Sequence, residues 1–137
     1  SKKNFVSNIY FFFRIISSGG TLCSSAFKMA HEEIVSNHPP ESWNTYLVEV
    51  SDGDNYLDDN LECVKIVNDL IPLCQQAGYL EITLDDSYTP WIREENLLSS
   101  MLKSQIKSDR FSSITIKNRN EIFNALRKFF KVDEGKK

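Results

Sequence analysis

The chain has 137 residues, of which 41% are hydrophobic and 26% are charged, so it is long and apolar enough to bury a core as one domain. This composition excludes an intrinsically disordered or low-complexity chain. The formal net charge of −3 lacks the basic excess that is typical of nucleic-acid binding, so we expect no nucleic-acid partner.

The N-terminal segment predicts neither a membrane span nor a signal peptide. Residues 9–16 form the longest dense apolar run, but this run contains Arg14 and is far too short to cross a bilayer. No small-residue cleavage site follows it. The three cysteines, Cys23, Cys63 and Cys74, have no C-x-x-C spacing and suit buried free thiols in a reducing compartment. We therefore expect a cytoplasmic protein with no membrane contact, and we interpret residues 9–16 as a strand.

Four segments have apolar residues at three-to-four spacing, which predicts helices. The first runs from about residue 22 to the residues before Pro39. The second begins near Asp58-Asp59-Asn60, whose side chains can cap its free N–H groups, and ends near Pro72, with Gly78 as the C-terminal stop. The remaining two are expected to begin at Thr89-Pro90 and at the capping box Asn118-Arg119-Asn120-Glu121.

Three segments rich in β-branched and aromatic residues predict strands at about 44–51, 79–84 and 111–116. Strands that alternate with helices of this length indicate right-handed crossovers and adjacent parallel strands. The prediction is a doubly wound (Rossmann-like) α/β fold, with helices on both faces of one parallel sheet, formed by residues 1–137 as a single domain.

Two polar segments are expected to meet at the carboxyl edge of this sheet. Gly19-Gly20-Thr21 brings a hydroxyl to the start of the first helix, and Asp52 follows the first clear strand. Ligands of open α/β sheets gather at the carboxyl ends of the strands. Hydroxyl and carboxylate oxygens suit a hard cation, although Asp52-Gly53 is also ordinary turn chemistry.

These residues resemble a known family. Ser18-Gly19-Gly20-Thr21-Leu22-Cys23-Ser24-Ser25-Ala26, Trp43-Asn44-Thr45-Tyr46 and Ser51-Asp52-Gly53-Asp54-Asn55 look like the corresponding blocks of the bacterial YeaH/YhbH family. That family consists of uncharacterised stress- and sporulation-associated proteins of the von Willebrand factor A-like superfamily. The resemblance covers roughly residues 10–131.

The resemblance implies an incomplete metal-ion-dependent adhesion site. Thr21 matches the superfamily's threonine and Asp52 matches its later aspartate, whereas the D-x-S-x-S loop of the first strand has no counterpart in this chain. Asp85-Asp86-Ser87-Tyr88-Thr89 has similar spacing but comes in the wrong chain order. We therefore expect a truncated von Willebrand A-like domain that lacks the usual first strand and helix and binds Mg²⁺ weakly at most. Asp54 and Asp85 could add oxygens to the site, and Gly19, Gly20 and Asn55 are expected to be binding residues.

The function that the resemblance implies is protein–protein interaction without catalysis. Its implied partners are a PrkA-type serine kinase and a SpoVR-like protein, whose genes typically neighbour those of the family. Loss of the first strand would leave a sheet edge uncovered, so we also expect a homo-dimer, formed by exchange of residues 9–16. Two alternatives remain open, namely a small metal-dependent hydrolase or phosphoryl-transfer domain and an inactive remnant.

Overall fold

The computed structural model describes residues 22–53, 55–83 and 97–130. Helices and strands alternate in these residues as the sequence predicts. Their order is α2 (Cys23–Asn37), β1 (Tyr46–Ser51), α3 (Leu57–Leu70), the 3-10 turn η1 (Ile71–Leu73), β2 (Gln76–Ile82), α4 (Leu98–Gln105), β3 (Phe111–Ile116), the 3-10 turn η3 (Arg119–Glu121) and α5 (Ile122–Phe130).

The three strands form one parallel sheet in the order β1-β2-β3. Ser51 at the end of β1 lies opposite Glu81 of β2, and Glu81 in turn lies opposite Thr115 of β3. Consecutive parallel strands joined through helices are the repeating unit of doubly wound α/β folds. The predicted parallel and adjacent strands are therefore confirmed.

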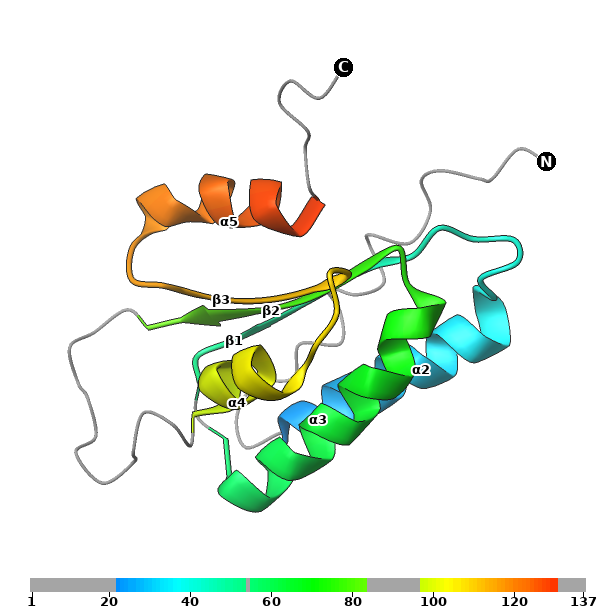
Figure 1. Ribbon diagram of the computed structural model, residues 1–137, viewed down its shortest axis with the longest axis horizontal. Coiled ribbons are helices and arrows are strands. Elements are labelled where there is room, and N and C mark those ends of the chain that lie inside the picture. Colours follow the sequence, from blue (N-terminus) through cyan, green and yellow to red (C-terminus); the bar gives the residue numbers. More distant parts are fainter. Residues whose placement is uncertain (1–21, 54, 84–96, 131–137) are drawn as a thin grey trace.

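Helices cover both faces of the sheet, as expected. Figure 1 shows α2, α3 and α4 on one side of the strands and α5 on the other. The larger core lies on the three-helix side and includes Phe27, Val67, Tyr79 and Leu102. The smaller core, on the α5 side, is built around Leu80, Ile116, Ala125 and Phe129.

The predicted role of Gly78 is wrong. Gly78 does not stop a helix but lies in β2, because the helix before it ends at the 3-10 turn that contains Pro72. A Cβ atom at Gly78 would overlap the ring of Phe129. The residue is therefore a glycine because α5 packs directly on the backbone of β2.

The predicted cap of α3 is also wrong. The helix begins at Leu57, after Tyr56, and the Tyr56 side chain makes no capping hydrogen bond. Asp59 consequently lies inside the first turn, and its carboxylate binds the neighbouring helix α2 instead. The capping box of Asn118 and Glu121 is confirmed, although it caps the 3-10 turn that leads into α5.

Several expectations lie outside the described residues. These are the strand at residues 9–16, the helix start at Thr89-Pro90, and the candidate site residues Gly19, Gly20, Thr21, Asp54 and Asp85.

Candidate functional site

The start of α2 and the loop between β1 and α3 are joined at the carboxyl end of β1. The backbone N–H of Cys23 donates to Oδ1 of Asn55, at an N···O distance of 3.2 Å. The next N–H, that of Ser24, donates to Oδ2 of Asp59 over 3.0 Å. Both N–H groups belong to the first turn of a helix, where no intrahelical partner exists. Side chains from the β1–α3 segment therefore satisfy the N-terminus of a helix more than 30 residues earlier.

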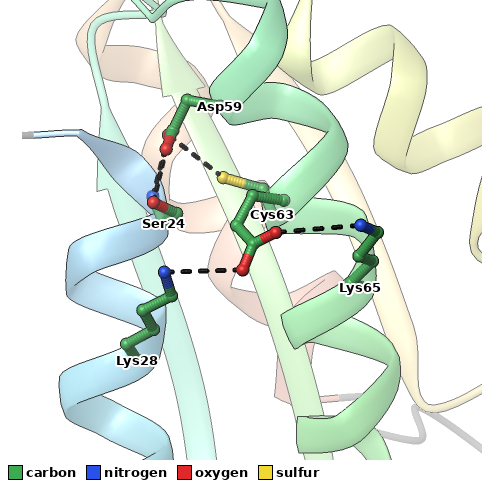
Figure 2. A network of polar contacts seen from close by, with 6 residues as sticks. Ser24, Lys28, Asp59, Cys63 and Lys65 are labelled. Carbon is green, nitrogen blue, oxygen red and sulfur yellow. Dashed lines mark hydrogen bonds and ion pairs between the residues drawn. The ribbon is translucent and has the colours of Figure 1, made fainter.

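We call the hydrogen-bonded set of Cys23, Ser24, Asn55, Asp59 and Cys63 the joint, and Asp59 is its main acceptor. Besides the N–H of Ser24, its carboxylate accepts hydrogen bonds from the Ser24 hydroxyl, from Nδ2 of Asn55 (2.9 Å) and from the Cys63 thiol (3.6 Å). Figure 2 shows Ser24 and Cys63 pointing at this carboxylate from two helices. Burial alone would raise the pKa of Asp59, but the hydrogen bonds from Ser24, Asn55 and Cys63 outweigh it and hold the pKa below its usual value.

Asn55, which the sequence predicts as a binding residue, is a cross-link in the structure. Its Oδ1 accepts from α2, while its Nδ2 donates to Asp59 and, over 2.7 Å, to Oδ1 of Asn60. Asn60 is 2% exposed, so this amide pair is shielded from water. An amide engaged on both sides fixes the loop and leaves its side chain little capacity to contact a ligand.

The turn after β1 depends on a glycine. Gly53 has φ of +86°, in the left-handed region, and its N–H donates to the Ser51 hydroxyl over 3.1 Å. A Cβ atom at Gly53 would lie 2.9 Å from Cδ of Glu81, which is buried on β2. Both the backbone angle and the contact with Glu81 favour glycine. This turn places Asp52, an exposed residue, at the carboxyl edge as the sequence predicts.

Glu49 is a member of the site that the sequence analysis missed. It points to the same face of β1 as Leu47 and Ser51, and its Oε2 is buried with no hydrogen-bond partner among the described residues. Burial, with a smaller contribution from the negative charge of Asp59, raises the pKa of Glu49 from 4.5 to about 8. Glu49 is therefore mostly protonated at neutral pH. Because side chains two residues apart in a strand point to the same face, the apolar Leu47 could have indicated that Glu49 points inward.

The cysteines are buried free thiols, as the sequence predicts. Burial, with further contributions from Glu49 and Asp59, raises the pKa of Cys23 to about 12 and also raises that of Cys63. A thiol acts as a nucleophile in its thiolate form. Cys23 and Cys63 are therefore structural members of the joint.

Asp52 and Asn55 are the predicted site residues that the structure describes, and they lie in the same loop. Among the described residues, no three His, Cys, Asp or Glu side chains form a group that could hold a metal ion. Asp59 is the best-placed carboxylate, but four donors already occupy its lone pairs. The described residues do not by themselves make up the oxygen shell of Mg²⁺.

A parallel sheet with helices on both faces and a polar loop at its carboxyl edge defines an α/β protein. Residues 6–133 match the family described as "Protein of unknown function (DUF444)". The chain belongs to this family, which is the YeaH/YhbH family of the resemblance given above.

The relatives are much longer than this chain. A UPF0229 protein of Bacillus cereus (strain B4264) is 36% identical over 126 residues, which make up 92% of this chain but 30% of the relative. UPF0229 proteins of Bacillus thuringiensis (strain Al Hakam) and Bacillus anthracis (strain A0248) have the same identity and coverage. No solved structure matches the chain. Within the described residues, no helix has the length and apolar character needed to span a membrane.

Proposed function

We propose that this chain is part of a von Willebrand A-like module that binds a protein partner at the carboxyl edge of its sheet and performs no catalysis. The observation that carries the proposal is the joint between α2 and the β1–α3 loop, in which Asn55 and Asp59 bind the first turn of α2. This joint restrains Asn55, which follows Asp52 in the same loop. A fixed, exposed loop lowers the entropy cost of binding a partner.

The polar groups of the joint support binding rather than catalysis. Asp59 is saturated with hydrogen-bond donors, and the raised pKa values of Cys23 and Cys63 disfavour a nucleophilic thiolate. Glu49 is partly buried, with its Oε2 shielded from solvent. Two surface hollows of the described residues, of about 140 and 280 Å³, are lined by residues outside the joint. A hydrolase or phosphoryl-transfer site would need a reactive group facing such a space.

This chain supplies too few ligands to complete the metal site of the proposed module. Asp52 and Thr21 would provide two oxygens, and Asp54 or Asp85 could add one or two more. Mg²⁺ demands a nearly octahedral shell of six oxygens, so water would have to fill the remaining positions. We propose that the partner is recognised mainly by direct contacts with the loop, with a weakly bound cation at most.

The proposed partners are a PrkA-type serine kinase or a SpoVR-like protein, in a stress or sporulation response in the cytoplasm. The free thiols of the three cysteines suit a reducing compartment. A homo-dimer is also proposed, because β1 has a neighbouring strand on one side only among the described residues.

The test is binding of each candidate partner, purified, to the immobilised chain. Asp52→Arg should weaken binding about tenfold or more, because it places a bulky opposite charge in the loop. The matched control is Asp69→Arg, since Asp69 is an exposed aspartate near the other end of α3. Equal binding by the wild type and both variants, or no binding of either partner, would contradict the proposal.

A further inference from the structure

Helix α5 has two apolar stripes, and only one of them faces the sheet. Ile122, Ala125 and Phe129 form the inner stripe, which packs on β2 and β3. The second stripe, Phe123, Leu126 and Phe130, repeats the same spacing one residue later, about 100° around the helix. These three side chains are 68%, 37% and 46% exposed. A helix that is apolar on two sides is normally covered on both.

The outer stripe continues onto the sheet. The rings of Phe130 and Tyr46 lie 5.8 Å apart, and Tyr46 is the first residue of β1. Tyr46 and Val50 point to the α5 side of β1 and are 50% and 48% exposed. The Phe130–Tyr46 contact joins the stripe on α5, about 10 Å long, to the exposed part of β1, about 13 Å long. We call Tyr46, Val50, Phe123, Leu126 and Phe130 the α5–β1 surface.

The charges beside the α5–β1 surface are positive. The guanidinium carbon of Arg127 lies 5.7 Å from the centre of the Phe123 ring, and Lys128 follows on the same helix. Helix α5 contains no acidic residue. A partner surface should therefore be apolar and bordered by acids.

A surface of that kind exists on the other side of the sheet, at the start of α3 (Figure 1). Tyr56, Leu57 and Leu61 are 73%, 49% and 50% exposed, and Leu57 and Leu61 are one helical turn apart. We call these three residues the α3 surface. Asp58 borders it in the first turn, and Glu62 follows, where its carboxylate pairs with Lys28 and Lys65.

We propose that the α3 surface of one copy of this chain docks on the α5–β1 surface of a second copy. The apolar side chains would bury each other, and Asp58 would approach Arg127 or Lys128. The sequence has the same asymmetry, because acids gather at residues 52–62 and bases from residue 119 onward. The two surfaces differ and lie on opposite faces, so the contact is head-to-tail and a dimer is its first step.

This inference deepens the self-association included in the proposed function and does not depend on the carboxyl-edge loop. The test uses two variants of the full chain, Phe123→Ser/Leu126→Ser and Leu57→Ser/Leu61→Ser, studied by analytical ultracentrifugation over a range of concentrations. All four positions are exposed, so folding should be retained, and circular dichroism checks this. The average mass of the wild type should rise with concentration, and each variant alone should associate about tenfold or more weakly.

An equimolar mixture of the two variants is the decisive sample. Each variant keeps one intact surface, so the mixture should form a dimer that grows no further with concentration. Met29→Ser, an exposed apolar position on α2 outside both surfaces, should behave as the wild type. A wild-type chain that is monomeric throughout would overturn the proposal. A wild-type dimer that both variants retain would also overturn it, while leaving self-association in the proposed function intact.

Discussion

At the scale of single residues, Asp59 and Glu49 lie close enough to influence each other yet have opposite pKa shifts. Four donors stabilise the ionised form of Asp59 and lower its pKa. Oε2 of Glu49 is buried with no hydrogen-bond partner among the described residues, and burial raises the pKa of Glu49 to about 8. The Asp59 carboxylate is therefore an ionised hydrogen-bond acceptor. The Glu49 carboxyl group is neutral at neutral pH and releases its proton only at higher pH.

Removal of the Asp59 carboxylate should destabilise the protein. Asp59→Ala leaves the buried N–H of Ser24 without its acceptor, and hydrogen bonds to a charged group contribute about 1.5–3 kcal/mol each. Because some donors can find water, we expect a loss of about 3 kcal/mol in the free energy of unfolding, measured by urea denaturation. Asp58→Ala, at the exposed neighbour in the same turn, should change it by about 0.5 kcal/mol or less. Similar losses in the two variants would contradict the role assigned to Asp59.

Glu49 should make stability fall as the pH rises. The folded protein holds the Glu49 proton up to about pH 8, whereas the unfolded chain releases it near pH 4.5. Its stabilising contribution is thus complete below pH 4.5 and is lost progressively as the pH rises toward 8. Glu49→Gln cannot ionise, so this variant should gain stability over the wild type between pH 5 and pH 8, by an amount on the order of a few kcal/mol.

Thermal unfolding at several pH values measures this effect. Glu41→Gln, at an exposed glutamate on the loop before β1, is the control and should follow the wild type. An unchanged pH dependence in Glu49→Gln would show that the Glu49 carboxyl group is not neutral in the folded state. The lowered pKa of Asp59 acts in the other direction, since its contribution is present above pH 3.8 and is lost as the pH falls further.

At the scale of elements, α5 packs directly on the backbone of β2. Gly78 has no side chain because the ring of Phe129 occupies the space where a Cβ atom would lie. Phe129 is fully buried and belongs to the smaller core with Leu80 and Ile116. The position of α5, and with it the α5–β1 surface, therefore depends on one glycine in the middle strand.

Gly78→Ala should destabilise the protein by about 1–3 kcal/mol, because the added methyl group overpacks this contact. Phe129→Leu removes Cε1 and Cζ, two of the three ring atoms that the methyl group would meet. In the Phe129→Leu background, Gly78→Ala should therefore lower the free energy of unfolding much less than it does in the wild type. A double-mutant cycle of urea denaturation measures this coupling. Additive effects of the two substitutions would mean that α5 does not pack on β2 at this position.

The order and type of the elements could be predicted from the sequence, because apolar spacing and turn residues are local signals. The strand at 111–116 was predicted with its observed bounds, because its β-branched and aromatic residues end at Ile116, two residues before the capping box that begins at Asn118. Gly78 was misassigned because the reason for that glycine is a contact with Phe129, about fifty residues later. The local sequence pattern around Gly78 cannot predict a contact with a residue so far along the chain.

The candidate site was predicted less completely than the fold. Asp52 and Asn55 were identified from the turn after β1, and both lie in the loop at the carboxyl edge. The role of Asp59 could not be predicted, because it is one of five acids between residues 52 and 62 and only the packing of α2 against α3 buries it. Glu49 could have been found from the alternation of β1, in which Leu47 and Ser51 share its face.

At the scale of the whole molecule, the polar joint and the apolar surfaces serve different purposes. The joint of Asn55 and Asp59 fixes the carboxyl-edge loop, which we propose as the site of partner binding. The α5–β1 surface and the α3 surface lie on opposite faces of the sheet and are proposed to join copies of the chain. The chain spans 30% of the length of the Bacillus cereus relative, so these surfaces correspond to one part of that longer protein.

The central claim is that the carboxyl edge of this chain is a protein-binding loop with an incomplete metal site. Isothermal titration calorimetry with Mg²⁺ and Mn²⁺, on the wild type and on Asp52→Ala, tests it most directly. Two to four protein oxygens leave the remaining coordination positions to water, so we predict binding on the order of millimolar or weaker and little gain in melting temperature. Tight binding of one ion per chain that is lost in Asp52→Ala would contradict the claim.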